Sequence, residues 1–262
     1  MKTRVVSFAR GSGWLLRGWR LFKVSPAMWL ALVFAYWGVM TLVSFVPLLG
    51  ISAATILIPG FSVGFMAASR DCERRAGLQL RVLFEGFRGR WPVQVALGVA
   101  YLLLLAAVIA GTTLADDGAL ARWMITGRRP EDDVLQSDEF FRALMLAAAL
   151  YMPVMMLYWF APVLGAWHSM GAGQALFYSF FASLLNWRAF LGYALATALV
   201  TMVVPFLVLG ALLLFSGGQL RFATMALVFP MLVVLLPTLF ASFYASYRDV
   251  FGADPAEQAS GG

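Results

Sequence analysis

The chain has 262 residues, of which 62% are hydrophobic and only 12% are charged. Soluble domains average about 45–50% apolar and about 25% charged residues, so this composition excludes an ordinary soluble enzyme or binding domain. The net charge of +6 does not indicate nucleic-acid binding, because the basic residues flank apolar runs. We therefore expect no nucleic-acid partner. The single cysteine excludes an intrachain disulfide.

About six long apolar runs without a charged residue follow one another along the chain. About 20 apolar residues of helix cross a bilayer core about 30 Å thick, and these runs are long enough. We predict an all-α, polytopic membrane protein with a six-span domain over residues 26–247. The predicted spans are 26–46, 48–69, 93–115, 143–167, 189–215 and 222–247. They hold no acid or base, which weakens any proton-coupled mechanism.

The segment 1–25, which precedes the first span, is basic and amphipathic. At 100° per residue its tryptophans fall on one arc and its basic residues on another, as in a helix that lies in the headgroup plane. The same residues could instead form the anchoring end of the first span, and the sequence leaves both interpretations open. The candidate headgroup residues of this segment are Trp14, Arg17, Trp19, Arg20 and Lys23.

The second and fourth predicted spans contain candidate packing and hinge residues. Gly60 and Gly64 form a G-x-x-x-G pattern, which lets another helix approach closely. Pro59 and Pro162 each remove a backbone hydrogen bond and can bend or break their helices. Transporters bind substrates at broken helices, whereas plain kinks only fit helices into a bundle, so both interpretations stay open.

Residues 60–64 also match G-x-S-x-G, the pattern of a nucleophile elbow. That motif works at a strand-to-helix turn, and here it lies inside an apolar helix. His168 is expected at the membrane interface and Ser62 about 10 Å deeper, which exceeds a hydrogen bond of about 3 Å. We predict that the protein is not an enzyme. An intramembrane serine hydrolase using Ser62 and His168 is the remote alternative, and we expect no metal and no cofactor.

Two further stretches are amphipathic. Residues 78–91 place apolar side chains on one arc and Arg81 and Arg88 on the other, so we predict a second surface helix that ends near Trp91. Residues 174–187 have an uncharged polar face, which suits packing on protein as well as contact with lipid. The molecule would thus carry two or three amphipathic surface helices beside its spans.

These two stretches also indicate a parallel internal repeat. Gly77 precedes Trp91 by the same spacing as Gly173 precedes Trp187, and a proline-containing span comes before each stretch. Transporters contain such repeats. Chance placement of aromatic residues would produce the same match.

The charges predict how the chain is oriented. About 14 of the 19 Lys and Arg residues lie on the side of the N-terminus and of the loop that follows residue 69. The loop between the third and fourth spans is acidic. Because positive residues stay on the cytoplasmic side, we predict that both termini are cytoplasmic. Residues 248–262 lack apolar periodicity and are predicted to form a disordered cytoplasmic tail.

Four segments carry a resemblance to a known family: GWLLRGWRLFKVSPAMW (13–29), FVPLLG (45–50), LIPGFSVGFMAASR (57–70) and LFEGFRGR (83–90). Together they resemble an uncharacterised family of bacterial multi-pass inner-membrane proteins. Those proteins begin with a basic, Trp-rich surface helix followed by a proline. They also carry a proline within the second span and a Phe-rich inner loop. The resemblance covers residues 13–91, implies a location in the inner membrane, and offers no catalytic residues.

The function expected from these observations is a non-enzymatic inner-membrane component that organises lipid or partner proteins. Its expected partners are the phospholipid bilayer and anionic lipids on the cytoplasmic face, while a homo-oligomer or a membrane-protein partner stays open. The alternative is a transporter or channel for a neutral or apolar solute, built on the kinks at Pro59 and Pro162.

Overall fold

The computed structural model of the protein describes residues 3–47, 49–215 and 220–252, without the side chains of residues 204, 215 and 220–232. Within these residues the chain is helical and contains no strand. In chain order the elements are α1 (Phe8–Ser12), α2 (Trp14–Phe22), α3 (Pro26–Ser44), α4 (Gly50–Glu73), the 3-10 helix η1 (Leu80–Phe87), α5 (Trp91–Asp116), α6 (Ala119–Thr126), α7 (Asp132–Leu135), α8 (Asp138–Tyr158), α9 (Ala161–Trp167), α10 (Ala172–Leu185), α11 (Trp187–Ala198), the π-helix η2 (Leu199–Val203), α12 (Val204–Phe215) and α13 (Leu220–Phe251). The all-α prediction is confirmed.

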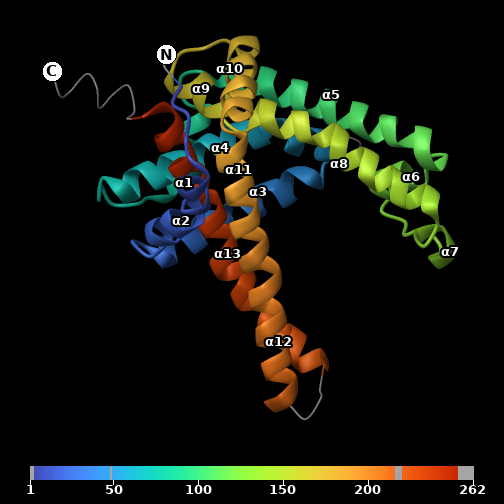
Figure 1. The fold of residues 1–262 in the computed structure, drawn as a ribbon. Helices are drawn as coiled ribbons and strands as arrows, with labels where there is room; N and C mark the ends of the chain where they lie inside the picture. The colour runs from blue at the N-terminus through green and yellow to red at the C-terminus, as the bar shows by residue number, and fades with distance from the viewer. Residues whose placement is uncertain (1–2, 48, 216–219, 253–262) are drawn as a thin grey trace.

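The long helices pair as arms that diverge from a common base (Figure 1). One arm consists of α5 and α8, with α6 and α7 at its far end. A second consists of α11, η2 and α12 alongside α13. The base is the region where α1, α2, α9 and α10 meet the ends of α4 and α13, and the residues that lead into α1 lie there (Figure 1).

Five stretches of helix among the described residues are long and apolar enough to cross a membrane. They are Pro26–Ser44, Gly50–Glu73, Trp91–Asp116, Asp138–Trp167 and Trp187–Leu214. Each matches one of the first five predicted spans, so the prediction of a polytopic protein is confirmed. The sixth predicted span, 222–247, falls on α13, and the side chains of its first part, 222–232, lie outside the described residues.

Several predicted boundaries need correction. The fourth span is not one helix, because α8 ends at Tyr158 and α9 starts at Ala161. In the fifth span, η2 directly precedes α12, which carries Pro205. A proline ring clashes with the carbonyl four residues earlier, and the wider π-turn at that point relieves such crowding. At the C-terminal end, α13 runs to Phe251, so a tail beginning at residue 248 is wrong for the first four residues. Residues 253–262 lie outside the described part of the chain.

The predicted surface helix at 78–91 is a 3-10 helix, η1, over eight residues only. A 3-10 helix repeats every three residues, which places Leu83 and Gly86 on the same side. Both are buried against α4, whereas Leu80, at the start of η1, and Phe84 are exposed. The second half of η1 thus brings its backbone at Leu83 and Gly86 against α4, a contact that the α-helical arc predicted from the sequence does not describe.

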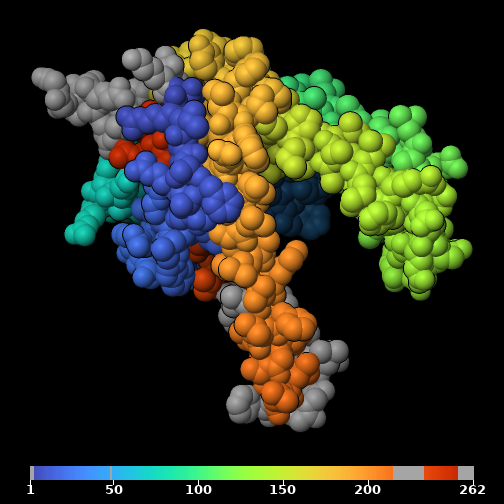
Figure 2. Space-filling model, in the orientation of Figure 1, coloured from blue at the N-terminus to red at the C-terminus, as the bar shows by residue number. Residues whose placement is uncertain are grey.

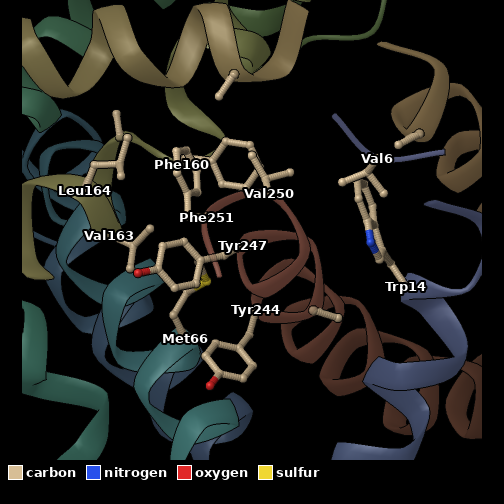
Figure 3. Packing of buried hydrophobic residues seen from close by; sticks show 14 of the residues in the cluster. Val6, Trp14, Met66, Phe160, Val163, Leu164, Tyr244, Tyr247, Val250 and Phe251 are labelled. Carbon is tan, nitrogen blue, oxygen red and sulfur yellow. The ribbon is translucent and has the colours of Figure 1, made fainter. Parts of the chain in front are cut away.

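The hydrophobic core lies in the base. Tyr244, Tyr247 and Phe251 on the last turns of α13 extend toward Val163 of α9 and Met66 of α4, and all five side chains are buried (Figure 3). The rings of Phe160 and Phe251 meet edge to face with their centroids 5.1 Å apart. A second cluster, around Trp29 and Phe65, fills the space between α3, α4 and η1. Aromatic burial thus joins the end of the chain to its middle.

Glycines bring α4 and η1 into backbone contact. A Cβ atom at Gly64 would clash with the carbonyl of Leu83, one at Gly60 with the ring of Phe87, and one at Gly86 with the carbonyl of Gly60. The G-x-x-x-G pair therefore lies against η1 and not against another spanning helix. Pro59 lies within the continuous helix α4 and is buried beside this contact.

We expect Gly64→Ala to destabilise the protein by about 1–3 kcal/mol, because the added methyl group overpacks the contact with Leu83. Gly38→Ala is the matched control, since a Cβ atom at Gly38 of α3 would meet no atom within 4 Å. Thermal unfolding of both variants in detergent measures the effect. Equal midpoints would contradict the assigned contact.

Candidate functional site

The N-terminal helices pack on the protein and are not free surface helices. Trp14 is completely buried, and its indole nitrogen donates to Oδ2 of Asp249 at 2.8 Å. Arg17 donates to both carboxylate oxygens of Asp249, the bond to Oδ1 measuring 2.9 Å. Gly18 lies against the backbone of α13 at Thr238. The complete burial of Trp14 corrects its assignment to lipid headgroups. Arg17 is bound to Asp249 and partly exposed, and its assignment to headgroups stays a prediction.

The remaining candidates on α2 do face outward. Arg20 and Lys23 are exposed and Trp19 is half-buried. The ammonium group of Lys23 lies 5.5 Å from the centre of the Trp19 ring, a cation–π distance. One face of α2 thus binds the protein, and the opposite face carries two cations beside an aromatic ring.

The charge on Asp249 is stabilised by its partners. Burial would raise the pKa of this carboxyl group, but the hydrogen bonds from Arg17 and Trp14 outweigh burial and hold the pKa of Asp249 below its ordinary value. Asp249 lies beyond the predicted sixth span, at the end of α13. Sequence reasoning missed this residue, although one signal was present: Asp249 is the first acid after Glu139.

Residues 3–7, which precede α1, form a segment without regular secondary structure that crosses the base and is called the strap. The side chain of Asn186 accepts a hydrogen bond from the amide of Val6 at 2.7 Å and donates to the carbonyl of Arg4 at 3.1 Å. The amide of Arg4 in turn donates to the carbonyl of Val250 at 2.8 Å. The strap is therefore hydrogen-bonded both to the last turn of α13 and to Asn186, the residue before α11.

The candidates near η1 lie on the surface. Arg81 and Arg88 are exposed, and Trp91, the first residue of α5, is 57% exposed. The neighbouring Glu85 instead forms a bidentate pair with Arg70 of α4, with both distances at 3.0 Å. In this respect η1 resembles α2. Each helix packs apolar residues and an ion pair against the protein and presents exposed basic side chains on its other side.

The break between α8 and α9 is bridged by α10. In an unbroken helix the amide of Phe160 would donate to the carbonyl of Met156, but here it donates to the hydroxyl of Ser179 at 3.0 Å. The same hydroxyl donates to the Met156 carbonyl at 2.9 Å. The inserted serine thus replaces one backbone bond just before Pro162, whose ring cannot continue a straight helix.

Gln94 of α5 supports the other side of the break by donating to the carbonyl of Pro162 at 2.9 Å. The uncharged polar face of α10 accordingly points inward, with Ser179 and Ser183 buried, while Phe177 and Phe181 are exposed. The sequence left open whether this polar face packs on protein or contacts lipid, and in the structure it packs on protein. Pro162 lies in a filled, hydrogen-bonded environment.

Ser62 and His168 form hydrogen bonds with different partners. The hydroxyl of Ser62 donates to the carbonyl of Pro59 in its own helix at 2.9 Å. Nε2 of His168 lies 2.7 Å from the hydroxyl of Tyr247, which is buried. Among the described residues, no group of three or more metal-ligating His, Cys, Asp or Glu side chains is present.

The predicted internal repeat has a limited counterpart. Trp91 and Trp187 are the first residues of α5 and α11, and they are exposed to nearly the same extent, 57% and 56%. The preceding helices differ, since η1 is a 3-10 helix and α10 an α-helix. The repeat stays a prediction.

Comparison with known proteins agrees with this architecture. The chain is 39% identical over 254 residues to a probable inner membrane protein of Burkholderia thailandensis, a match that covers 94% of this chain and 93% of the relative. The chain belongs to this family of bacterial inner-membrane proteins. The resemblance expected from residues 13–91 is thereby confirmed over almost the whole length. No protein-family model matches the chain, and no solved structure matches it.

We expect Asp249→Asn to lower the free energy of unfolding by about 2 kcal/mol, because charge-assisted hydrogen bonds from Arg17 and Trp14 are lost. The pKa of Asp249 is depressed on folding, so its contribution is present above an unfolded pKa of about 3.9. It is lost as the pH falls through the folded pKa. The difference between wild type and variant should therefore be constant from about pH 8 to 5 and shrink below about pH 4.

Thermal unfolding in detergent, followed by Trp emission, measures this difference. Asp132→Asn is the matched control, because its pair with Arg129 is exposed and should contribute less than about 1 kcal/mol. A pH-independent difference, or equal effects of the two variants, would contradict the assignment.

We expect Ser179→Ala to destabilise the protein by about 2 kcal/mol, since the buried amide of Phe160 loses its hydrogen-bond acceptor. Ser44→Ala should change stability by less than about 0.5 kcal/mol, because Ser44 is exposed and only donates to Met40 in its own helix. Hydrogen exchange at residues 156–162 tests the local effect. Unchanged exchange there in Ser179→Ala would show that the serine does not bridge the break.

Proposed function

We propose that the protein is a non-enzymatic component of the inner membrane that organises anionic phospholipid around its base. The observation that carries this proposal is that two separate helices each present basic side chains outward while their other face is packed against the protein. Arg20 on α2 and Arg81 on η1 are exposed, as are Lys23 and Arg88, the residues that directly follow these helices. The opposite faces of both helices are buried in the protein.

The tryptophans support a headgroup position for these cations. Trp91 and Trp187 are exposed at the first residues of α5 and α11, and tryptophan collects at the membrane–water interface. Each basic residue near an anionic surface contributes about 1 kcal/mol of attraction. Four exposed cations, at α2 and η1, therefore favour anionic lipid around the base.

We infer a cytoplasmic location for the base and for both termini from the excess of Lys and Arg on that side. The chain offers a direct check, because Lys2 and Lys23 are its only lysines. A membrane-impermeant amine reagent should label the protein in inside-out vesicles and not in intact spheroplasts.

The packing supports a role without catalysis or solute transport. The hydroxyl of Ser62 is used within its own helix, and the space beside Pro59 is filled by the ring of Phe87. Pro162 is surrounded by hydrogen bonds that close the helix break. The two prolines on which a solute path would depend thus lie in occupied space.

We expect the fourfold variant Arg20→Gln, Lys23→Gln, Arg81→Gln and Arg88→Gln to lose its preference for phosphatidylglycerol over phosphatidylcholine. At about 1 kcal/mol for each cation, every position should contribute up to about a fivefold local preference. The measurement is the lipid composition that co-purifies with the protein from mixed nanodiscs.

The matched control removes four charges from the opposite side, with Arg122, Arg128, Arg129 and Arg142 changed to Gln. This control should keep the preference for phosphatidylglycerol. Loss of the preference in both variants, or in neither, would sink the proposed function, because position at the base would then not matter.

A further inference from the structure

A groove runs along the base where the strap meets the start of α11. It has a volume of about 610 Å³ and is open to the surroundings. That size lies within the range of about 300–1,000 Å³ found for small-molecule sites. Its lining residues are Val5, Val6, Ser7, Phe8, Trp187, Arg188 and Leu191. In Figure 2 the N-terminal segment lies beside α11, whose first residues form the opposite wall.

Both walls of this groove are held in place. Asn186, directly before α11, binds the strap through the amide of Val6 and the carbonyl of Arg4. A Cβ atom at Gly11 would clash with the backbone of Ala189, and one at Gly192 would lie 2.5 Å from the carbonyl of Phe8. The two walls therefore meet in backbone contact below the groove, which is a fixed feature of the surface.

The groove combines apolar walls with one cation. Val5, Phe8, Trp187 and Leu191 are all among the exposed large hydrophobic side chains. The guanidinium carbon of Arg188 lies 5.6 Å from the centre of the Trp187 ring. A cation–π contact of this kind does not use up the guanidinium N–H donors, and because Arg188 is exposed they can reach an oxyanion.

The surrounding sequence is electropositive. No acid occurs before Asp71, and none lies between Glu139 and Asp249. Asp249 itself is bound to Arg17 and Trp14. Charge complementarity therefore favours an anionic occupant, and the apolar walls favour one with hydrocarbon chains.

We propose that this groove binds one anionic phospholipid, whose phosphate contacts Arg188 and whose acyl chain lies along Phe8 and Leu191. The proposal rests on the proposed function, because it assigns a discrete site to the same lipid class. It uses none of the four cations on α2 and η1, so the two proposals can fail separately.

Native mass spectrometry of the delipidated full-length protein, titrated with phosphatidylglycerol, tests the site. Wild type should bind one lipid more tightly than the rest, and Arg188→Gln should weaken that step by about fivefold. Leu191→Trp, which keeps every charge and narrows the groove, should weaken the same step. Arg90→Gln is the control, because Arg90 adjoins Trp91 at the start of α5 as Arg188 adjoins Trp187 at the start of α11.

A photoreactive phosphatidylglycerol should crosslink to peptides that contain residues 5–8 or 187–191. Normal first-step affinity in both Arg188→Gln and Leu191→Trp would overturn the proposal, and so would equal first-step affinity for phosphatidylcholine. If the fourfold α2 and η1 variant still binds its first phosphatidylglycerol tightly, the groove is supported, even where the overall preference for phosphatidylglycerol over phosphatidylcholine is not found. Loss of the lipid preference in the fourfold variant, together with normal first-step affinity in both Arg188→Gln and Leu191→Trp, would leave only the proposed function standing.

Discussion

The last turns of α13 hold the base of the molecule together. Asp249 binds Trp14 and Arg17 of α2, while the carbonyl of Val250 binds the strap. On the other side of the same helix, Tyr244 donates to Glu73 of α4 at 2.7 Å and Tyr247 meets His168. The last turns of α13 thus contact the strap and α2, the end of α4, and His168 directly after α9. Folding of the base must therefore wait until most of the chain is present.

Where a helix ends inside the protein, its unpaired backbone N–H and C=O groups need hydrogen-bond partners from side chains. A backbone group away from water is costly to leave unpaired, so a helix can break within an apolar protein only where side chains replace its lost bonds. Ser179 and Gln94 do this at the α8–α9 break. Asn186 does the same for the strap. These uncharged side chains allow irregular backbone near the spans without placing an acid or base there.

The sequence predicted the helical class and the first five spans well, because length and hydropathy alone determine which helices can cross a bilayer. It did not determine whether the apolar and polar faces of the amphipathic segments meet lipid or protein. A stripe of tryptophans looks the same whether it meets lipid or protein, and Trp14 meets protein because Asp249, 235 residues later, provides a partner for its indole. The serines of α10 point inward for the same kind of reason. Long-range partners of this sort leave no local periodicity. The only sign of this one in the sequence is that Asp249 is the first acid after Glu139, at the end of a long apolar run.

Glycine contacts mark the places where helices pack backbone to backbone. Contacts that would exclude a methyl group occur at Gly11, Gly18, Gly64 and Gly86, and also at Gly98, where α5 meets α4 at Ile56. By contrast, Gly38 and Gly210, on α3 and α12, meet no atom within 4 Å, and bulky residues such as Phe206 are exposed.

Association of helices within a membrane depends on close packing, because lipid is as apolar as the side chains themselves. The arms are therefore suited to contact with acyl chains. The base and its surroundings carry exposed cations, exposed tryptophans and a groove between two segments in backbone contact. On the function we propose, lipid selectivity arises there and the arms hold this surface at the level of the headgroups.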